Sequence, residues 1–157
     1  MSVIKKSSMS MSINQFNIDN LYFSEPVINN IIDNGTFYIL QYSDECINLN
    51  SIILRIPIEN CHLIKFQNKY KCVFNENYRK IIDSLKRIEI MCLSKIHSRK
   101  EPKLNLFEQI RNNCIKFFSK HDYPDKPNKF YINFKISGVW ENENNFGITY
   151  KCYDDYN

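Results

Sequence analysis

The chain has 157 residues, a length that is sufficient for one domain with a single hydrophobic core. Hydrophobic residues make up 43% of the sequence and charged residues 24%, a composition that excludes a generally disordered chain. No stretch of about eighteen apolar residues occurs, so the sequence excludes a membrane-spanning helix. The formal net charge of +4 arises because a basic centre, residues 51–135 with a net charge of +10, lies between two ends that are each net −3.

The N-terminal third predicts a tail followed by strands. Residues 1–14 are rich in Ser and Met with little periodicity, so we expect a flexible tail there and a single globular domain over residues 15–157. Residues 36–42 and 52–58 are rich in aromatic and β-branched side chains and predict two strands. Pro57 lacks a backbone N–H, which places the second strand at a sheet edge or a bulge.

The next segment predicts a β-hairpin. Its arms are residues 62–66 and 70–74, and three residues join them. Strand side chains alternate between the two faces, so Tyr70, Cys72 and Phe74 share one face of the second arm. Lys69 and Lys71 are then expected to point away from that face.

Two helices are predicted after this hairpin. Apolar residues recur every three or four positions from Ile81 to Ile96, which predicts an amphipathic helix over residues 76–96 with Asn75 as its cap. The same spacing resumes further on and predicts a second helix over residues 105–118. Basic residues on the polar side of the first helix either form a solvated face or follow a phosphate backbone, and the sequence leaves both interpretations open.

The clearest β pattern lies at the C-terminal end. Hydrophobic and polar residues alternate from Phe130 to Ser137 and again from Phe146 to Tyr153, which predicts a hairpin with one apolar and one polar face. Gly138 predicts a bulge or a close packing point. The order of elements predicts a mainly β or α+β domain, built as an OB-like small barrel or a curved antiparallel sheet with two helices inserted before the C-terminal hairpin.

No sequence motif predicts catalysis. The chain has only three glycines and contains no glycine-rich phosphate loop, no zinc-protease motif and no serine-hydrolase motif. The six cysteines form no Cys-x-x-Cys pair, so we expect buried free thiols in an intracellular, reducing compartment. Cys61 beside His62 could ligate a metal, but a lone adjacent pair is a weak signal against the alternative of structural thiols, and we predict no metal, no cofactor and no enzyme.

Binding is better supported than catalysis. Single-stranded nucleic acid is held by a basic surface with aromatic platforms for the bases, and 14% of the residues are aromatic. Tyr131 shares a strand face with Lys135, and Tyr153 shares one with Lys151. Trp140 follows the first of these strands. The alternative is that these three rings cover the second helix and contact no base.

The C-terminal segment INFKISGVWENENNFGITYKCY, residues 132–153, resembles the closing hairpin of short proteins encoded by large nucleocytoplasmic DNA viruses. The matching residues are Lys135 to Glu141 and Gly147 to Lys151, and the segment from Asn34 to Ser43 is also similar to such proteins. A composition with 23 Ile and 21 Asn but no Ala, typical of AT-rich genomes, agrees with this origin. More remotely, the hairpin is similar to the last strands of phage-type and poxvirus-type single-stranded DNA-binding proteins, which have an OB fold.

The basic centre and the resemblance together predict a non-catalytic single-stranded DNA-binding protein of a large DNA virus, acting in replication, repair or recombination. Its expected partners are single-stranded nucleic acid and replication proteins, with no membrane, and the resemblance implies a host cytoplasm or a viral factory as its location. The alternative is a viral protein–protein interaction or structural module that does not bind nucleic acid. The residues predicted to contact phosphates are Lys65, Lys69, Lys71, Lys135 and Lys151, and those predicted to stack on bases are Tyr131, Trp140 and Tyr153.

Overall fold

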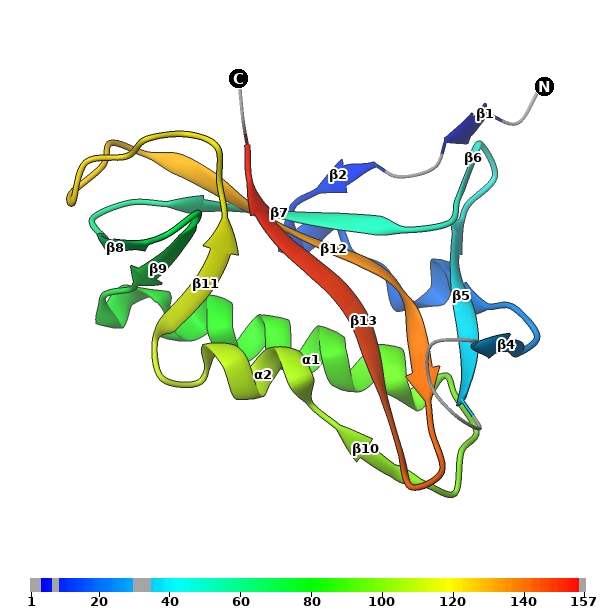
Figure 1. Ribbon diagram of the computed structural model, residues 1–157. Helices are drawn as coiled ribbons and strands as arrows, with labels where there is room; N and C mark the ends of the chain where they lie inside the picture. Colours follow the sequence, from blue (N-terminus) through cyan, green and yellow to red (C-terminus); the bar gives the residue numbers. More distant parts are fainter. Residues whose placement is uncertain (1–3, 7–8, 30–34, 156–157) are drawn as a thin grey trace.

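The computed structural model describes residues 4–6, 9–29 and 35–155. Its strands form a mixed sheet, and two helices, α1 (Arg79–Ser94) and α2 (Asn105–Ile110), lie side by side against it (Figure 1). The strands are β1 (Ile4–Lys6), β2 (Ser10–Met11), β3 (Leu21–Phe23), β4 (Val27–Asn29), β5 (Gly35–Ser43), β6 (Ile47–Leu49), β7 (Ile52–Ile58), β8 (His62–Phe66), β9 (Lys69–Val73), β10 (Glu101–Lys103), β11 (Cys114–Phe118), β12 (Phe130–Glu141) and β13 (Asn145–Asp154). Three short 3-10 helices complete the chain: η1 (Ile13–Gln15), η2 (Ile18–Asn20) and η3 (Glu76–Tyr78).

The predicted fold class is confirmed, because the protein is mainly β with two helices. The sheet runs in the order β1-β6-β5-β12-β13-β11-β9-β8 and is open, since β1 and β8 at its two ends do not pair with each other. It is mixed and not purely antiparallel, because β11 and β10 both run parallel to β13. The described strands therefore form a curved open sheet, and an OB-like barrel stays a prediction.

The predicted strands occur in the structure. β5 and β7 cover the two segments expected near the N-terminus, and β12 and β13 form the C-terminal hairpin. Pro57 lies in β7 opposite Tyr131 of β12. The other side of β7 pairs with β2 only at Ile53 and Leu54, so Pro57 occupies an edge position, as predicted. The β8–β9 hairpin is tighter than predicted, because two residues and not three join its strands.

The described part of the segment 1–14, where we expected a flexible tail, packs onto the domain. Ser10 and Met11 form β2 and pair in parallel with β7. The side chain of Met11 is buried in the core. The residues that are described in this segment thus extend the sheet.

The predicted helix over residues 105–118 is wrong in its second half. Helix α2 ends at Ile110, Asn113 adopts a φ of 60°, and residues 114–118 form β11. Asn tolerates this left-handed conformation better than most residues, so the chain can turn there without glycine. In β11 the buried Ile115 and Phe117 alternate with exposed residues, and pairing with β9 fixes that alternation.

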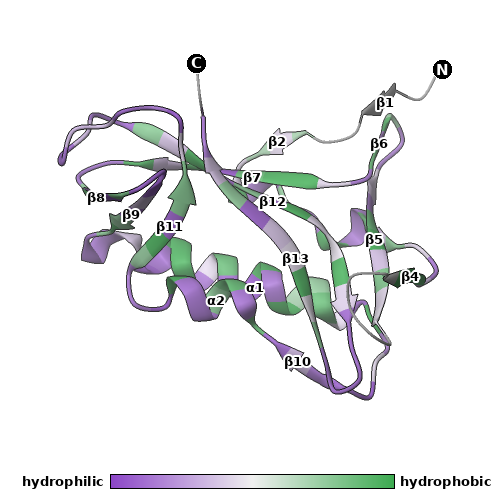
Figure 2. Cartoon of the chain, viewed as in Figure 1, coloured by the Kyte–Doolittle hydropathy of each residue, from purple (hydrophilic) through white to green (hydrophobic). Residues whose placement is uncertain are grey.

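The core lies between the sheet and α1. Inward-facing residues of β7 and β12 pair with one another, as Leu54 does with Phe134, and the apolar side of α1 contributes Ile82, Leu85 and Ile88. Figure 2 shows hydrophobic residues along β7, β12 and the sheet side of α1, and hydrophilic residues in the loop between β11 and β12. One face of the sheet is therefore covered, and the other is free to carry function.

Helix α2 is held at its first turn by a buried carboxylate. Glu89 of α1 is fully buried, and its Oε2 and Oε1 accept hydrogen bonds from the backbone N–H groups of Leu106 (2.8 Å) and Phe107 (2.9 Å). The N-cap residue Leu104 has no side chain that can accept these bonds. Glu89 thus supplies the cap that the sequence of α2 lacks.

Gly138 lies at the predicted irregularity of β12. The register with β13 shifts between Ile136 and Gly138, and a Cβ atom at Gly138 would lie 2.3 Å from the carbonyl oxygen of Tyr38. We expect Gly138→Ala to lower the free energy of unfolding by about 2 kcal/mol, because the backbone of β5 would have to move. Urea denaturation measures this, with Ser137→Ala as the neighbouring control. An unchanged stability of the Gly138 variant would show that the β5–β12 contact is not close.

Among the described residues, no helix is both long and apolar enough to cross a membrane.

Candidate nucleic-acid interface

The sheet face opposite the helices is called the outward face. It is formed by alternate residues of β7, β8, β9, β11, β12 and β13, and the strand register shows that they share one side. One row of paired residues crosses all six strands, in the order Phe66, Lys69, Phe118, Tyr153, Asn133 and Arg55. At a spacing of about 4.8 Å between strands, this row is about 24 Å wide.

Lysines flank this row on neighbouring strands. Lys71 of β9 pairs with Lys116 of β11, and Lys135 of β12 pairs with Lys151 of β13. Like charges directly opposite each other destabilise a sheet, so two such pairs are costly unless an anion lies across them. The structure thus brings together four of the lysines that the outward face offers to a polyanion.

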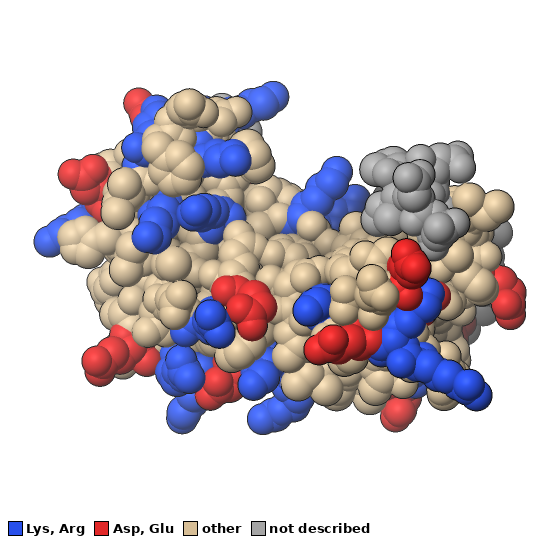
Figure 3. Space-filling model, turned by 60° about the horizontal axis from the view of Figure 1, so that its bottom comes forward, with Lys and Arg blue, Asp and Glu red and all other residues tan. Residues whose placement is uncertain are grey.

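No acidic residue occupies an outward strand position in these six strands, all of which lie in the described part of the chain. The helix side of the molecule differs. Figure 3 turns that side forward and shows groups of Lys and Arg side chains separated by Asp and Glu. The distinctive property of the outward face is therefore that its strand positions place no carboxylate between its lysines. Asp155, which follows β13, brings a carboxylate to the edge of this face, where it contacts Arg55 and Asn133.

Two aromatic rings on the outward face are open to solvent. Phe118 is 54% exposed and Phe66 is 40% exposed. The ammonium group of Lys69 lies 4.9 Å from the ring centre of Phe118, and that of Lys116 lies 5.9 Å from the ring centre of Phe66. Exposed rings beside lysines are the combination that holds single-stranded nucleic acid, because rings stack on bases and lysines neutralise phosphates.

Tyr131 is already engaged by protein groups. The guanidinium carbon of Arg55 lies 3.5 Å from its ring centre. Arg55 also donates from Nε to Oδ2 of Asp155 at 2.5 Å, and Asn133 donates from Nδ2 to Oδ1 of the same carboxylate at 2.5 Å. These contacts fix Tyr131 at the edge of the outward face, and a base could reach it only beside or in place of Arg55.

Lys65 differs from the other predicted lysines. Its residue pairs with the buried, inward-facing Tyr70, so it lies on the opposite side of β8 from the outward face. Its Nζ donates to Oδ1 of Asp122 at 2.9 Å, and this bond raises the pKa of Lys65. The structure therefore does not bring Lys65 together with Lys69 and Lys71.

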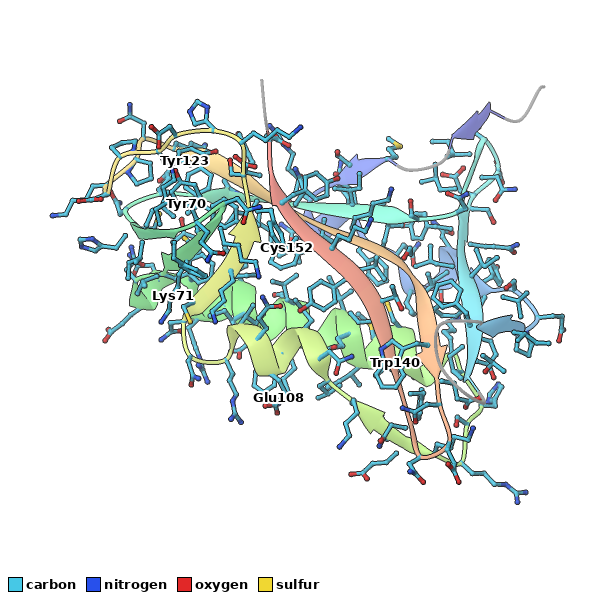
Figure 4. All side chains as sticks on the ribbon, viewed as in Figure 1. Tyr70, Lys71, Glu108, Tyr123, Trp140 and Cys152 are labelled. Carbon is cyan, nitrogen blue, oxygen red and sulfur yellow. The ribbon has the colours of Figure 1, made fainter. Side chains whose placement is uncertain are left out.

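Trp140 is also separate. It pairs with Gly147 near the turn of the β12–β13 hairpin, about 30 Å along β12 from Tyr131 at the usual rise per residue. A Cβ atom at Gly147 would lie 2.7 Å from Cζ2 of Trp140, so the indole packs over the space that glycine leaves. Figure 4 shows Trp140 at the opposite end of the molecule from Lys71 and Tyr123. The geometry of Trp140 is that of a packing residue.

Sequence reasoning missed four residues of the outward face: Arg55, Phe66, Lys116 and Phe118. Lys116 and Phe118 lie in a segment that the sequence predicts to be helical, and a helix would not place them on a sheet face. The alternation of buried and exposed positions from Cys114 to Phe118 is the signal that could have found them. Arg55 and Phe66 lie in correctly predicted strands, but only the register shows which residues they adjoin.

The described residues hold no group of three or more His, Cys, Asp and Glu side chains suited to a metal ion. All six cysteines are free thiols; Cys61, Cys72 and Cys92 are buried, and Cys46 is exposed. Burial raises the pKa of Cys92 to about 12, so this thiol stays protonated at neutral pH.

The chain matches no protein-family model, no curated protein and no solved structure. The resemblance to proteins of large DNA viruses and to single-stranded DNA-binding proteins therefore stays a prediction.

Proposed function

We propose that the protein binds single-stranded DNA, without catalysis, across its outward face. The observation that carries this proposal is the row of exposed rings and lysines that crosses the sheet with no carboxylate among its strand positions. The phosphates contact Lys69, Lys71, Lys116, Lys135 and Lys151, and the bases stack on Phe66, Phe118 and Tyr153. The sequence resemblance adds the setting of viral DNA replication, repair or recombination.

Binding of this kind is strongly dependent on salt. Five phosphate contacts give a slope of about −3.5 in a plot of log affinity against log salt, so raising salt fourfold weakens binding about 100-fold. Fluorescence anisotropy of a labelled oligothymidylate, measured at several salt concentrations, tests this. Duplex DNA of equal length is the control, because paired bases cannot stack on the rings. A flat salt dependence, or equal affinity for duplex, contradicts the proposal.

A second candidate is a protein-interaction module, and a specific patch favours it. The outward side of β5 and its neighbours exposes Tyr22, Val27 and Ile39, close to Phe37 and Trp140. Contiguous apolar surface of this kind is typical of protein contacts. Ile39 pairs with Gly138, three residues along β12 from Lys135, so a partner protein on this patch, such as a replication protein, would lie beside a DNA strand on the lysines.

A further inference from the structure

A pocket lies where the outward face ends. It has a volume of about 400 Å³ and is enclosed by the loop between β11 and β12 on one side and by the ends of β7, β12 and β13 on the other. Arg55, Tyr131 and Asp155 belong both to the pocket and to the edge of the outward face. A strand that follows the outward face toward this edge therefore meets the pocket, with the loop as its far wall.

The loop that forms this wall is anchored at several points. The hydroxyl of Tyr123 donates to Oδ2 of Asp154 at 2.5 Å, and its backbone N–H donates to the hydroxyl of Tyr70 at 3.1 Å. The N–H of Leu63 donates to the carbonyl of Asp125 at 2.8 Å. Figure 4 shows Tyr70 and Tyr123 together at the base of the loop. The pocket is thus preformed, so ligand binding does not include the free-energy cost of ordering this loop.

The lining suits a planar ring that carries a negative charge. Three rings surround the space, those of His121, Tyr123 and Tyr131, and Lys129 and Arg55 supply positive charge. The carboxylate of Asp155 forms an ion pair with Arg55 and accepts a hydrogen bond from the uncharged amide of Asn133. Arg55 and Asp155 therefore balance each other, and Lys129 is the cation that leaves the pocket positive. The Nζ of Lys129 is 3.6 Å from Glu59, an exposed contact that phosphate can replace easily. Rings together with the cation of Lys129 match a nucleotide, because the rings can stack on its base and the ammonium group can bind its phosphate.

A buried polar residue, Asn133, does not line the pocket itself but contacts one of the residues that do. Asn133 is 2% exposed, and among the residues that the structure describes its Oδ1 has no hydrogen-bond partner. Such unpaired buried atoms are rare in proteins and often mark a functional site or an ordered water. Asn133 contacts Asp155, which itself lines the pocket.

We propose that this pocket binds the phosphate-bearing terminal nucleotide of a DNA strand whose remaining nucleotides lie on the outward face. The inference rests on the proposed function for the position of the strand, but the pocket chemistry alone also accepts a free nucleoside monophosphate. The protein is then a binder of strand ends as well as of strand interiors, which distinguishes linear from circular single strands.

The test compares a linear oligothymidylate, phosphorylated at its 5′ or 3′ end, with its ligated circle of equal length by anisotropy. We expect the linear strand to bind about tenfold more tightly, because one charge-assisted phosphate contact is worth about that much. Lys129→Ala should remove this preference and leave the affinity for the circle unchanged. Lys126→Ala is the matched control, since Lys126 is exposed on the same loop and does not line the pocket.

The outcomes separate the two proposals. Equal binding of linear and circular strands overturns the terminal-nucleotide inference and leaves the outward face as a binder of strand interiors. If neither strand binds, the proposed function fails. In that case, the protein is titrated with thymidine monophosphate alone while the NMR signals of His121 are followed. This titration tests whether the pocket binds a free nucleotide. Shifts that Lys129→Ala abolishes support a nucleotide pocket for free ligand, and no shifts overturn it.

Discussion

Replacing Glu89 with alanine is expected to lower the free energy of unfolding by about 3 kcal/mol. The change leaves the backbone N–H groups of Leu106 and Phe107 buried without an acceptor. Each such loss costs about 1–3 kcal/mol, and relief from burying a carboxylate offsets only part of the sum. Urea denaturation with an unchanged m-value measures the effect. Asp83→Ala, an exposed acid of the same helix, should change stability by less than about 0.5 kcal/mol.

The pH dependence gives the same residue a second readout. Burial raises the pKa of Glu89 above its usual 4.5, against its two N–H bonds, which lower it. A group with a raised native pKa contributes stability that is full below the unfolded pKa and is lost as pH rises through the native pKa. The difference in unfolding free energy between the native protein and Glu89→Ala should therefore grow as pH falls from neutral toward 4.5. A difference that shrinks would mean that the native pKa is lowered.

Sequence patterns identified the elements well where one period dominated. The strict alternation of β12 and β13 and the spacing of four, three and four residues along α1 each suit only one kind of element. The segment 105–118 failed because its apolar residues fit both a helix and a helix followed by a strand. Local propensity could not decide between these, since pairing of β11 with β9 and β13 is a contact between distant parts of the chain.

The candidate site could be predicted only in part, for a related reason. Alternation showed correctly that Lys69, Lys71, Lys135, Lys151 and Tyr153 point away from the core. It could not show that β11 lies between β9 and β13. Because of this strand order, the lysines of the β8–β9 hairpin and those of the β12–β13 hairpin lie on one continuous surface. Sequence order suggests that Trp140 lies close to Tyr131, but the rise along β12 separates the two side chains.

Reversing the charge of the paired lysines Lys71 and Lys116 is expected to weaken binding of single-stranded DNA by about 100-fold or more. The double variant Lys71→Glu with Lys116→Glu removes two phosphate contacts and adds two charges that repel the backbone. The fold should persist, because Lys116 is exposed and Lys71 is only partly buried. Anisotropy with an oligothymidylate at physiological salt measures the affinity, and urea denaturation of the same variant checks the stability.

The matched control separates the outward face from overall charge. Lys80→Glu with Arg87→Glu makes the same change in net charge at two exposed positions of α1, on the helix side of the sheet. If DNA lies across the outward face, this variant keeps most of the affinity, since at physiological salt charges separated by more than about 8 Å are largely screened. An equal loss in both variants would mean that DNA responds to net charge alone. Unchanged binding in the Lys71 and Lys116 variant would exclude the outward face, and the apolar patch around Ile39 would then become the leading candidate for a functional surface.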